Sequence, residues 1–270
     1  SYPTAPHFSE AVGSGIYRNW LRELHFDQPL SLYLHVPFCH QLCWYCGCHT
    51  AVANSYQRVA AYVALLRREI DLLGSVLGKG RPVTGLHWGG GTPSILSAED
   101  FAAVMAELRR VFDFRPGAEL AIEIDPRHLT ASKAEALAAA GINRASLGVQ
   151  DFNPHVQVSI NRVQPFEATA AAARALREAG IAALNFDLMY GLPHQSLKDV
   201  KQTASLAADI HPDRVSVFGY AHVPWMKKHQ KMIDTAALPG AEGRLAQAEM
   251  AERVLLLRGY RAVGMDHFAL

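Results

Sequence analysis

The segment Leu32–Cys48, LYLHVPFCHQLCWYCGC, joins an apolar run to a loop that holds all four cysteines of the 270-residue chain. The run Leu32–Val36 is strand-like, and Cys39, Cys43 and Cys46 follow it directly in a C-x3-C-x2-C pattern. An α/β barrel builds its active site from loops at the carboxyl ends of its strands. The segment therefore predicts both the start of such a fold and the place of its chemistry.

Downstream of this segment, strand-like and helix-like stretches alternate along the chain. We expect strands near residues 31–37, 83–89, 119–125, 144–149, 183–189 and 214–220, with a seventh starting near Tyr260. Helices are expected near residues 55–77, 98–111, 131–140, 166–179, 197–208 and 241–258. This order is typical of parallel strands joined by crossover helices and predicts an α/β fold, a partial (β/α)6 barrel. An open doubly wound sheet is the main alternative.

The chain has few candidate domain boundaries. Half of its residues are hydrophobic, which suffices for one large core, so residues 26–270 are expected to form a single barrel domain. Residues 1–25 precede the first strand, and the turn-rich stretch Ser1–Pro6 predicts an N-terminal arm. Residues 221–240 are expected to form a long loop after the sixth strand, and loops of this length are often functional.

Several helix boundaries are marked by residues with known preferences for helix ends. Ser97 and Thr130 stand where helices are expected to begin, because their hydroxyls can accept a hydrogen bond from the first turn. Gly141, Gly180 and Gly259 each follow a helical stretch, where glycine adopts the left-handed backbone at little cost. These three glycines are interpreted as helix ends and not as functional residues.

Charge and hydropathy exclude several classes of protein. The formal net charge is +1 at pH 7, so neither nucleic acid nor an anionic membrane is an expected partner, and a small polar substrate is the default. No stretch of about 18 or more apolar residues occurs, and Ser1–Phe8 lacks the pattern of a secretory signal, which predicts a cytoplasmic location. Cytosolic thiols stay reduced, so metal or cluster ligation explains the cysteines better than disulfides do.

The spacing of the cysteines favours a [4Fe–4S] cluster. Three thiolates can hold three irons and leave the fourth open to a non-protein ligand, which implies chemistry at that iron. A structural zinc site is the alternative, although its cysteine pairs are usually separated by a dozen or more residues. Cys48 leaves a choice open, because it could be a fourth ligand that closes the site or a separate thiol.

Polar residues recur at the expected carboxyl ends of the strands. They are Tyr33 and His35, Glu123 and Asp125, Gln150, Asn185 and Asp187, and Tyr220. The glycine run in Trp88–Pro93, WGGGTP, follows the second predicted strand and either brings the backbone close to a ligand or forms only a tight turn. On its residues alone Arg162 is interpreted as a surface arginine, and a histidine on an apolar strand is usually a core residue.

The stretch Tyr33–Cys48 resembles the radical S-adenosylmethionine (SAM) enzymes, and specifically the family of oxygen-independent coproporphyrinogen III oxidases. Cys48 belongs to the pattern of that family, whereas related haem-carrying proteins typically have an aromatic residue there. The resemblance extends over nearly the whole chain. It implies that Cys39, Cys43 and Cys46 bind the cluster and that Cys48 does not. The glycine run resembles the GGE-type motif of the superfamily, with Thr92 where many relatives have an acid.

The resemblance also implies the cofactor contacts. SAM would contact Tyr33, Gly90, Gly91, Thr92, Glu123, Gln150, Arg162, Asp187 and Ala221, with the aromatic ring of Tyr45 nearby. Glu123 would accept from the methionyl ammonium, Arg162 would pair with the carboxylate, and Asp187 would accept from ribose hydroxyls. The family is unusual in holding two SAM molecules. Tyr33 and His35, which share one face of the first strand, are the candidate catalytic residues.

The activity that this resemblance implies is oxidative decarboxylation without oxygen. A 5′-deoxyadenosyl radical, released by reductive cleavage of SAM, would take hydrogen from a propionate side chain of coproporphyrinogen III. Loss of carbon dioxide and one electron leaves a vinyl group, and two rounds give protoporphyrinogen IX in haem biosynthesis. We also expect an electron donor such as flavodoxin or ferredoxin, and a monomer. Lys227 and Lys228 are candidates for the substrate carboxylates by charge alone.

Family members continue past the position of Leu270 into a mostly helical domain that helps to cover the barrel mouth, and the 270 residues do not include it. Weak or absent turnover is therefore expected from this length of chain. The alternatives to the oxidase are a haem-binding carrier of the same superfamily, a truncated inactive copy and a structural zinc protein.

Overall fold

The computed structural model describes residue 7 and residues 11–270. Its main feature is one eight-stranded sheet in the order β1-β4-β5-β6-β7-β8-β10-β9. The six long strands pair in parallel: β1 (Leu30–Val36), β4 (Arg81–Gly90), β5 (Phe112–Ile124), β6 (Arg144–Gln150), β7 (Ala183–Tyr190) and β8 (Arg214–Gly219). All six lie where the sequence predicted strands, and they confirm the α/β fold.

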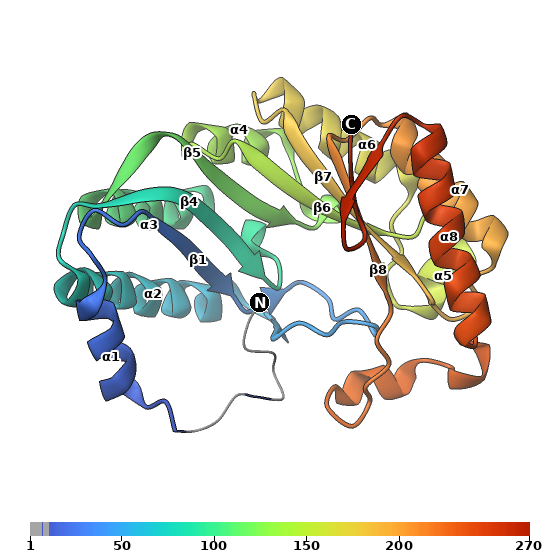
Figure 1. Cartoon of the computed structure of the whole chain (residues 1–270), viewed down its shortest axis with the longest axis horizontal. Coiled ribbons are helices and arrows are strands. Elements are labelled where there is room, and N and C mark those ends of the chain that lie inside the picture. Colours follow the sequence, from blue (N-terminus) through green and yellow to red (C-terminus); the bar gives the residue numbers. More distant parts are fainter. Residues whose placement is uncertain (1–6, 8–10) are drawn as a thin grey trace.

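The helices that join these strands lie on the outer side of the curved sheet, as Figure 1 shows. They are α2 (Tyr56–Leu77), α3 (Ala98–Val111), α4 (Ala131–Ala139), α6 (Phe166–Glu178), α7 (Leu197–Asp209) and α8 (Ala241–Leu257). Ser97 and Thr130 cap α3 and α4 as predicted, because each hydroxyl accepts from the backbone amide three residues later. In the part of the chain that the structure describes, no helix is long and apolar enough to cross a bilayer.

The end of the chain differs from the prediction of one terminal strand. Two short strands, β9 (Arg261–Gly264) and β10 (His267–Ala269), form a hairpin in which β10 pairs with β8 in antiparallel fashion. Only Met265 and Asp266, both with positive φ, separate the two strands. So short a connection reverses the chain and cannot cross back to a parallel position, so the sheet is mostly rather than wholly parallel.

Two helices and a small second sheet were not predicted. Helix α1 (Ser14–Glu23) lies within the predicted N-terminal arm, and none of its residues is buried. The turn-rich part of that arm, Ser1–Pro6, lies outside the described residues. Helix α5 (Pro154–Ser159) follows β6, and a two-stranded sheet joins β2 (Phe38–Cys39) to β3 (Ala51–Val52) at the two ends of the cysteine loop. Of these elements, β2 contributes Cys39 to the cavity described below.

The main core lies between the sheet and its outer helices. Along β6, the buried residues Ala145, Leu147 and Val149 alternate with Ser146, Gly148 and Gln150 on the other face. Along β1, Leu34 and Val36 are buried while Tyr33 and His35 lie on the opposite face, as the strand alternation predicted. One face of the sheet is therefore apolar and covered, and the concave face carries polar side chains.

Candidate active site

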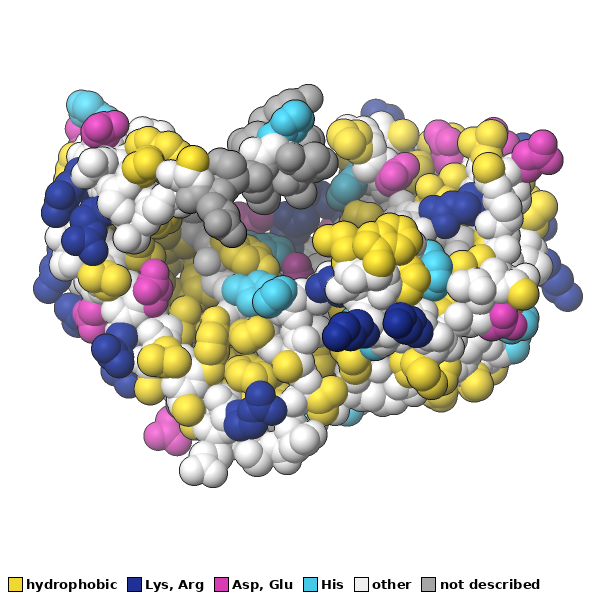
Figure 2. Space-filling model, turned by 90° about the horizontal axis from the view of Figure 1, so that it is seen from below, with side chains coloured by type: hydrophobic (Ala, Val, Ile, Leu, Met, Phe, Trp, Pro, Cys, Tyr) yellow, Lys and Arg dark blue, Asp and Glu magenta, His cyan; other side chains and the backbone are white. Residues whose placement is uncertain are grey.

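The concave face of the sheet carries a cavity of about 430 Å³ between the cysteine loop, residues 39–50, and the inner ends of β4 to β8. Figure 1 shows the loop in light blue on the open side of the sheet, and Figure 2 views this side, which is hollowed near its centre. Most of the predicted site residues line the cavity: Cys39, Cys43, Tyr45, Cys46, Gly90, Gly91, Thr92, Glu123, Gln150, Arg162 and Asp187.

Four of the strand-end and cofactor residues predicted above do not line this cavity, and one of them, Tyr220, is buried in a separate apolar cluster. The Tyr33 ring is stacked at 5.9 Å on His87, and its hydroxyl donates over 3.1 Å to His35 Nδ1. His35 Nε2 donates to the His49 carbonyl over 2.8 Å, so this histidine fastens the end of the cysteine loop to β1. Ala221 lies beyond the end of β8 with its side chain exposed. Tyr33 and His35 are therefore beside the cavity, and their catalytic role remains a prediction.

The sulfurs of the three predicted ligands all have hydrogen-bonding neighbours. Thr92 Oγ1 donates to Cys39 Sγ over 3.5 Å, and Thr50 Oγ1 lies 3.2 Å from the same sulfur. The backbone amide of Cys48 donates to Cys46 Sγ over 3.4 Å. Such donors act as outer partners that orient a sulfur ligand. Within the described residues, no three Cys, His, Asp or Glu side chains converge as a single metal ion requires, whereas a [4Fe–4S] cluster takes each thiolate on a different iron.

Cys43 is buried beside a charged group of three residues. Arg162 Nη1 donates to Cys43 Sγ over 3.5 Å, and Arg127 Nη2 lies 3.9 Å from the same sulfur. Asp125 bridges the two arginines, at 2.6 Å from Arg127 and 3.6 Å from Arg162. The surface interpretation of Arg162 is wrong, because its side chain is only 8% exposed. Two guanidinium groups therefore contact the Cys43 sulfur.

The charged group also shifts the pKa of its members. Burial alone raises the pKa of Asp125, but the hydrogen bonds from Arg127 and the charge of Arg162 outweigh it and lower the pKa to about 2. Burial alone lowers the pKa of Arg162, and the anionic forms of Tyr45, Asp125 and Cys43 raise it above its usual value. Both groups are therefore ionised at neutral pH. Arg162 Nε is buried with no partner among the described residues, which leaves a donor for an acidic ligand group.

A series of hydrogen-bonded polar side chains from β6, β7 and β8 forms another part of the cavity wall. Ser216 donates to Asn185 over 3.1 Å, and Asn185 donates to Asp187 over 2.8 Å. Ser146 donates to the second oxygen of Asp187, also over 2.8 Å. Burial raises the pKa of Asp187, and these two hydrogen bonds oppose the rise. Each carboxylate oxygen keeps a free lone pair, so Asp187 can still accept from ligand hydroxyls.

The backbone amides of the glycine run at the end of β4 are already hydrogen-bonded within the protein, although the sequence suggested that they could bind a ligand. The amide of Gly91 donates to the Val36 carbonyl over 2.8 Å, and the amide of Thr92 donates to the Phe38 carbonyl over 2.7 Å. A Cβ on Gly91 would lie 2.5 Å from that Phe38 carbonyl oxygen. The Gly90 amide donates to Glu123 over 3.2 Å. These contacts explain the glycines by close packing against the cysteine loop.

Several cavity residues were missed. They are Gln41, His87, Arg127, Arg144, Ser146, Ser216, Phe218 and His267. The alternation of strand side chains could have found Ser146 and Ser216, because they share a face with Gln150 and with the strand-end residues of their neighbours. No sequence signal places Arg127, which turns back onto Cys43 from a loop 84 residues later.

The first half of the cysteine loop is held by the segment that follows α5. The Trp44 amide donates to the Ile160 carbonyl over 3.0 Å. Asn161 Nδ2 donates to the Leu42 carbonyl, and Asn161 Oδ1 accepts from Gln41, each over 2.9 Å. Since Arg162 follows immediately, one short segment fixes both the loop and the arginine beside Cys43.

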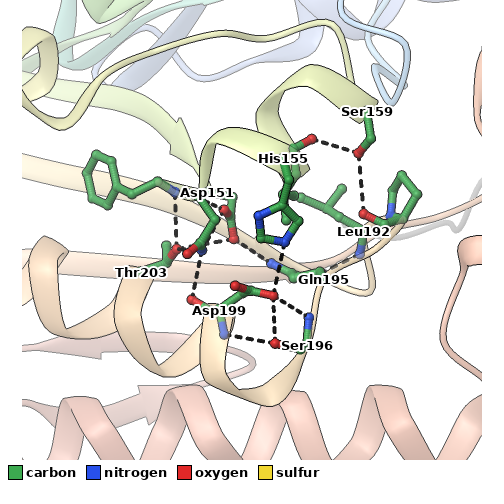
Figure 3. Close-up of polar contacts among 12 residues, drawn as sticks. Asp151, His155, Ser159, Leu192, Gln195, Ser196, Asp199 and Thr203 are labelled. Carbon is green, nitrogen blue, oxygen red and sulfur yellow. Dashed lines mark hydrogen bonds and ion pairs between the residues drawn. The ribbon is translucent and has the colours of Figure 1, made fainter.

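Figure 3 shows a polar network around α5, the helix that precedes this segment. Asp151 follows β6, is 1% exposed, and accepts over 2.8 Å from Gln195 and over 3.1 Å from Thr203 of α7. Its other oxygen accepts from the backbone and side-chain nitrogens of Asn153. Burial raises the pKa of Asp151, although these four hydrogen bonds oppose the rise. The network joins the start of α5 to α7.

The fold and the three-cysteine loop define a radical SAM protein. A family model described as the Radical SAM superfamily matches residues 33–207, so the chain belongs to this superfamily. Over 269 residues it is 52% identical to the oxygen-independent coproporphyrinogen III oxidase of Bradyrhizobium diazoefficiens and 41% identical to that of Escherichia coli K12. These alignments cover the whole chain but 60% and 58% of the relatives, so the chain spans about 60% of their length.

A solved structure, described as coproporphyrinogen III oxidase (HemN) from Escherichia coli, a radical SAM enzyme, agrees with the whole chain. The TM-score is 0.95 at 41% identity, and the match covers 62% of the solved chain. Membership of the superfamily implies a [4Fe–4S] cluster and SAM as cofactors. The donors to three cysteine sulfurs, the buried arginine and the acidic groups around the cavity fit these cofactors.

Proposed function

We propose that the chain carries the catalytic domain of an oxygen-independent coproporphyrinogen III oxidase, which converts two propionate side chains of coproporphyrinogen III to vinyl groups. The observation that supports this most strongly is the match of the whole chain to relatives of that name, at up to 52% identity. The product would be protoporphyrinogen IX. We assign residues 26–270 to one radical SAM domain, preceded by an arm of residues 1–25.

The chain's own residues would hold and orient the cofactors. Cys39, Cys43 and Cys46 would bind the cluster, and Cys48 would stay free. When bound, the cluster and SAM supply a carbon-centred radical that removes hydrogen from the propionate. Further contacts to one or two SAM molecules are assigned to Tyr33, Tyr45, Gly90, Gly91, Thr92, Glu123, Gln150, Arg162, Asp187 and Ala221, with Tyr33 and His35 beside the reacting centre.

Three of these assignments rest on charge and hydrogen-bonding capacity. Arg162 is permanently cationic and keeps a buried unpaired donor, which suits a carboxylate. Glu123, whose side chain is 40% exposed, can accept from an ammonium group. Asp187 can accept from ribose hydroxyls. The protein's part in this chemistry would be to orient the reactants and to exclude water and oxygen, because the cofactors carry out the difficult step.

We further propose an electron donor such as flavodoxin or ferredoxin, a monomeric state and a cytoplasmic location. The external donor is required because reductive cleavage of SAM consumes an electron. The four cysteines are all free thiols, which a reducing compartment preserves.

The test is an anaerobic assay with coproporphyrinogen III. The chain is reconstituted with iron and sulfide, reduced, and given SAM and the substrate, and 5′-deoxyadenosine and carbon dioxide are measured together. The two products are expected to appear together, at the weak turnover that this length of chain predicts. Deoxyadenosine without carbon dioxide, from a chain that binds the substrate, would contradict the proposed substrate while leaving the radical site intact.

Two cysteine variants provide the matched control. Cys46→Ser should lose the cluster absorbance and all deoxyadenosine, because it removes one of three iron ligands. Cys48→Ser, a thiol-to-hydroxyl change only two residues away, should retain iron at the wild-type level. Loss of iron in both variants would refute the assignment of Cys48 as a free thiol.

A further inference from the structure

The segment Lys227–Gln230, which follows β8, donates three hydrogen bonds to backbone carbonyls of the cysteine loop. Lys227 Nζ donates to the Cys48 carbonyl over 2.9 Å. His229 Nε2 donates to the Cys46 carbonyl over 2.7 Å, and Gln230 Nε2 donates to the Tyr45 carbonyl over 2.9 Å. We call this arrangement the carbonyl clamp. The carbonyl clamp forms hydrogen bonds with the second half of the loop, whereas the segment after α5 forms hydrogen bonds with the first half.

Gln230 is the most constrained member of the carbonyl clamp. Its side chain is fully buried, at 0% exposure. Its Oε1 accepts from the Val223 amide over 2.6 Å, and its Nε2 donates a second hydrogen bond, to the Ala221 carbonyl over 3.2 Å. Because both ends of the amide have partners, its orientation is fixed. The Gln230 side chain thus links two parts of the loop after β8 to each other, and it also links this loop to the cysteine loop.

A small apolar cluster lies next to the carbonyl clamp. Ile233, three residues after Gln230, is buried with Tyr220 and Ile160 in a cluster separate from the main core. Trp44 and Tyr45 of the cysteine loop pack against this cluster. The two residues that precede Cys46 are therefore held by side-chain packing, and the carbonyls on both sides of its sulfur are held by hydrogen bonds.

We propose that Gln230 is a positioning residue for Cys46, and that the carbonyl clamp sets how firmly this thiolate holds its iron. A metal ligand on a loop keeps its direction only if its peptide groups are fixed, and loss of such outer partners typically weakens metal binding about 10–100-fold. This inference rests on the proposed function only through the assignment of Cys46 as an iron ligand. It does not depend on the substrate.

The test compares two buried glutamines. Gln230→Met removes both hydrogen-bonding roles while it keeps an unbranched side chain of similar length. Gln247→Met does the same to a glutamine that is 2% exposed and ties α8 to Gly191 and Gln195, away from the cysteine loop. For each reconstituted protein the rate of iron release to a chelator and the EPR spectrum of the reduced cluster with SAM are measured anaerobically.

The expected result is iron release about tenfold faster in Gln230→Met than in wild type, with a broadened EPR signal. Gln247→Met should lower the melting temperature yet leave both cluster readouts at their wild-type values. Equal iron release in the two variants would overturn the proposal, because Gln230 would then act only through general stability.

A second variant covers the case in which Gln230→Met does not fold. His229→Phe removes the hydrogen bond to the Cys46 carbonyl at a partly exposed position, where the fold is at less risk. It should also release iron severalfold faster than wild type, and an unchanged rate would count against the carbonyl clamp. Wild type could hold its cluster and cleave SAM without decarboxylating the porphyrinogen. That result would contradict the proposed substrate, but the iron-release rates of the variants would still test the carbonyl clamp.

Discussion

Asp125 and Asp151 are buried aspartates that follow the neighbouring strands β5 and β6, yet their surroundings are opposite. Asp125 lies between two guanidinium groups, which lower its pKa to about 2. Asp151 is surrounded by neutral donors from Asn153, Gln195 and Thr203, and burial raises its pKa. The first carboxylate belongs to a group of full charges, and the second belongs to a network of amides and hydroxyls.

The difference follows from what each aspartate faces. Asp125 lines the cavity beside Cys43, where Arg127 and Arg162 contact the cysteine sulfur and need a counter-charge of their own. Asp151 lies outside the cavity, between α5 and α7, where only the packing of two elements has to be fixed. Full charges are therefore buried beside the cysteine that is proposed to bind iron. Between α5 and α7, neutral hydrogen bonds are enough to fix the geometry.

The largest effect is expected from Asp125→Asn. This change leaves the buried guanidinium of Arg162 and the mostly buried one of Arg127 without their counter-charge, which should cost about 3–5 kcal/mol of unfolding free energy. The cluster should also be lost, because the segment that carries Arg162 holds the cysteine loop. Urea unfolding and iron analysis of the purified variant measure both effects. A variant that keeps its iron would show that the charged group is not needed beside Cys43.

An intermediate effect is expected from acid, and the two aspartates should respond with opposite signs. The pKa of Asp125 falls from 3.8 to about 2 on folding, so its contribution of about 2 kcal/mol is present above pH 4 and is lost as the pH falls towards 2. The pKa of Asp151 is raised, so its contribution is present below its unfolded pKa and is lost as the pH rises through the folded value.

Unfolding free energies of the cluster-free chain between pH 5 and pH 2 measure this difference. The gap between wild type and Asp125→Asn should narrow as the pH falls, because the advantage of the ionised carboxylate disappears. The gap between wild type and Asp151→Asn should widen over the same range. Two gaps that move in the same direction would break the comparison between the charged group and the neutral network.

A smaller effect is expected from Asp151→Asn at neutral pH. One carboxylate oxygen becomes an amide donor that faces other donors, so part of the network is left unsatisfied at a cost of about 1–3 kcal/mol. The iron content and the cluster spectrum should stay unchanged, since the charged group beside Cys43 is intact. Chemical denaturation with parallel iron analysis gives the answer, and iron loss equal to that of Asp125→Asn would contradict it.

The smallest effect is expected from Ser196→Ala. Ser196 caps α7 in a reciprocal arrangement with Asp199, one turn before Thr203 reaches Asp151. Loss of this cap should cost about 1 kcal/mol in unfolding free energy. The contacts of Asp151 should survive, so the iron content and the cluster spectrum should match wild type. Stability should depend less on pH in the acid range, because the Ser196 hydroxyl helps to lower the pKa of Asp199 and this contribution is lost in the variant. A loss of stability as large as that of Asp151→Asn would mean that the cap also supports Asp151.

The sequence predicted the strands and long helices well because each of these elements has one buried face, and a buried face gives a regular spacing of apolar residues. It also placed Asp125 at a strand end on the active face. It could not predict that Arg127 and Arg162 meet there, because that meeting depends on how two later loops turn back. The hairpin after Tyr260 was missed because its strands are too short to show an alternation.

The cysteine loop offers a second example of this limit. Its spacing predicted three iron ligands, but nothing in Leu32–Cys48 indicates which segments fix it. Ile160–Arg162 and Lys227–Gln230 supply those contacts from far along the chain, and their residues have no motif of their own. Gly91 was interpreted as a ligand contact or a turn, whereas its lack of a side chain is also required by the Phe38 carbonyl.

The distance along the chain between the loop and the carbonyl clamp has a consequence for biosynthesis. His229 is made 183 residues after Cys46. At about 5–20 residues per second, a ribosome needs on the order of 10–40 s to cover that distance. During this interval the thiols emerge on a nascent chain whose retaining segment does not yet exist. If the carbonyl clamp holds Cys46 as proposed, firm iron binding at this cysteine begins only after residue 230 has been made, and the thiol is open to oxidants until then.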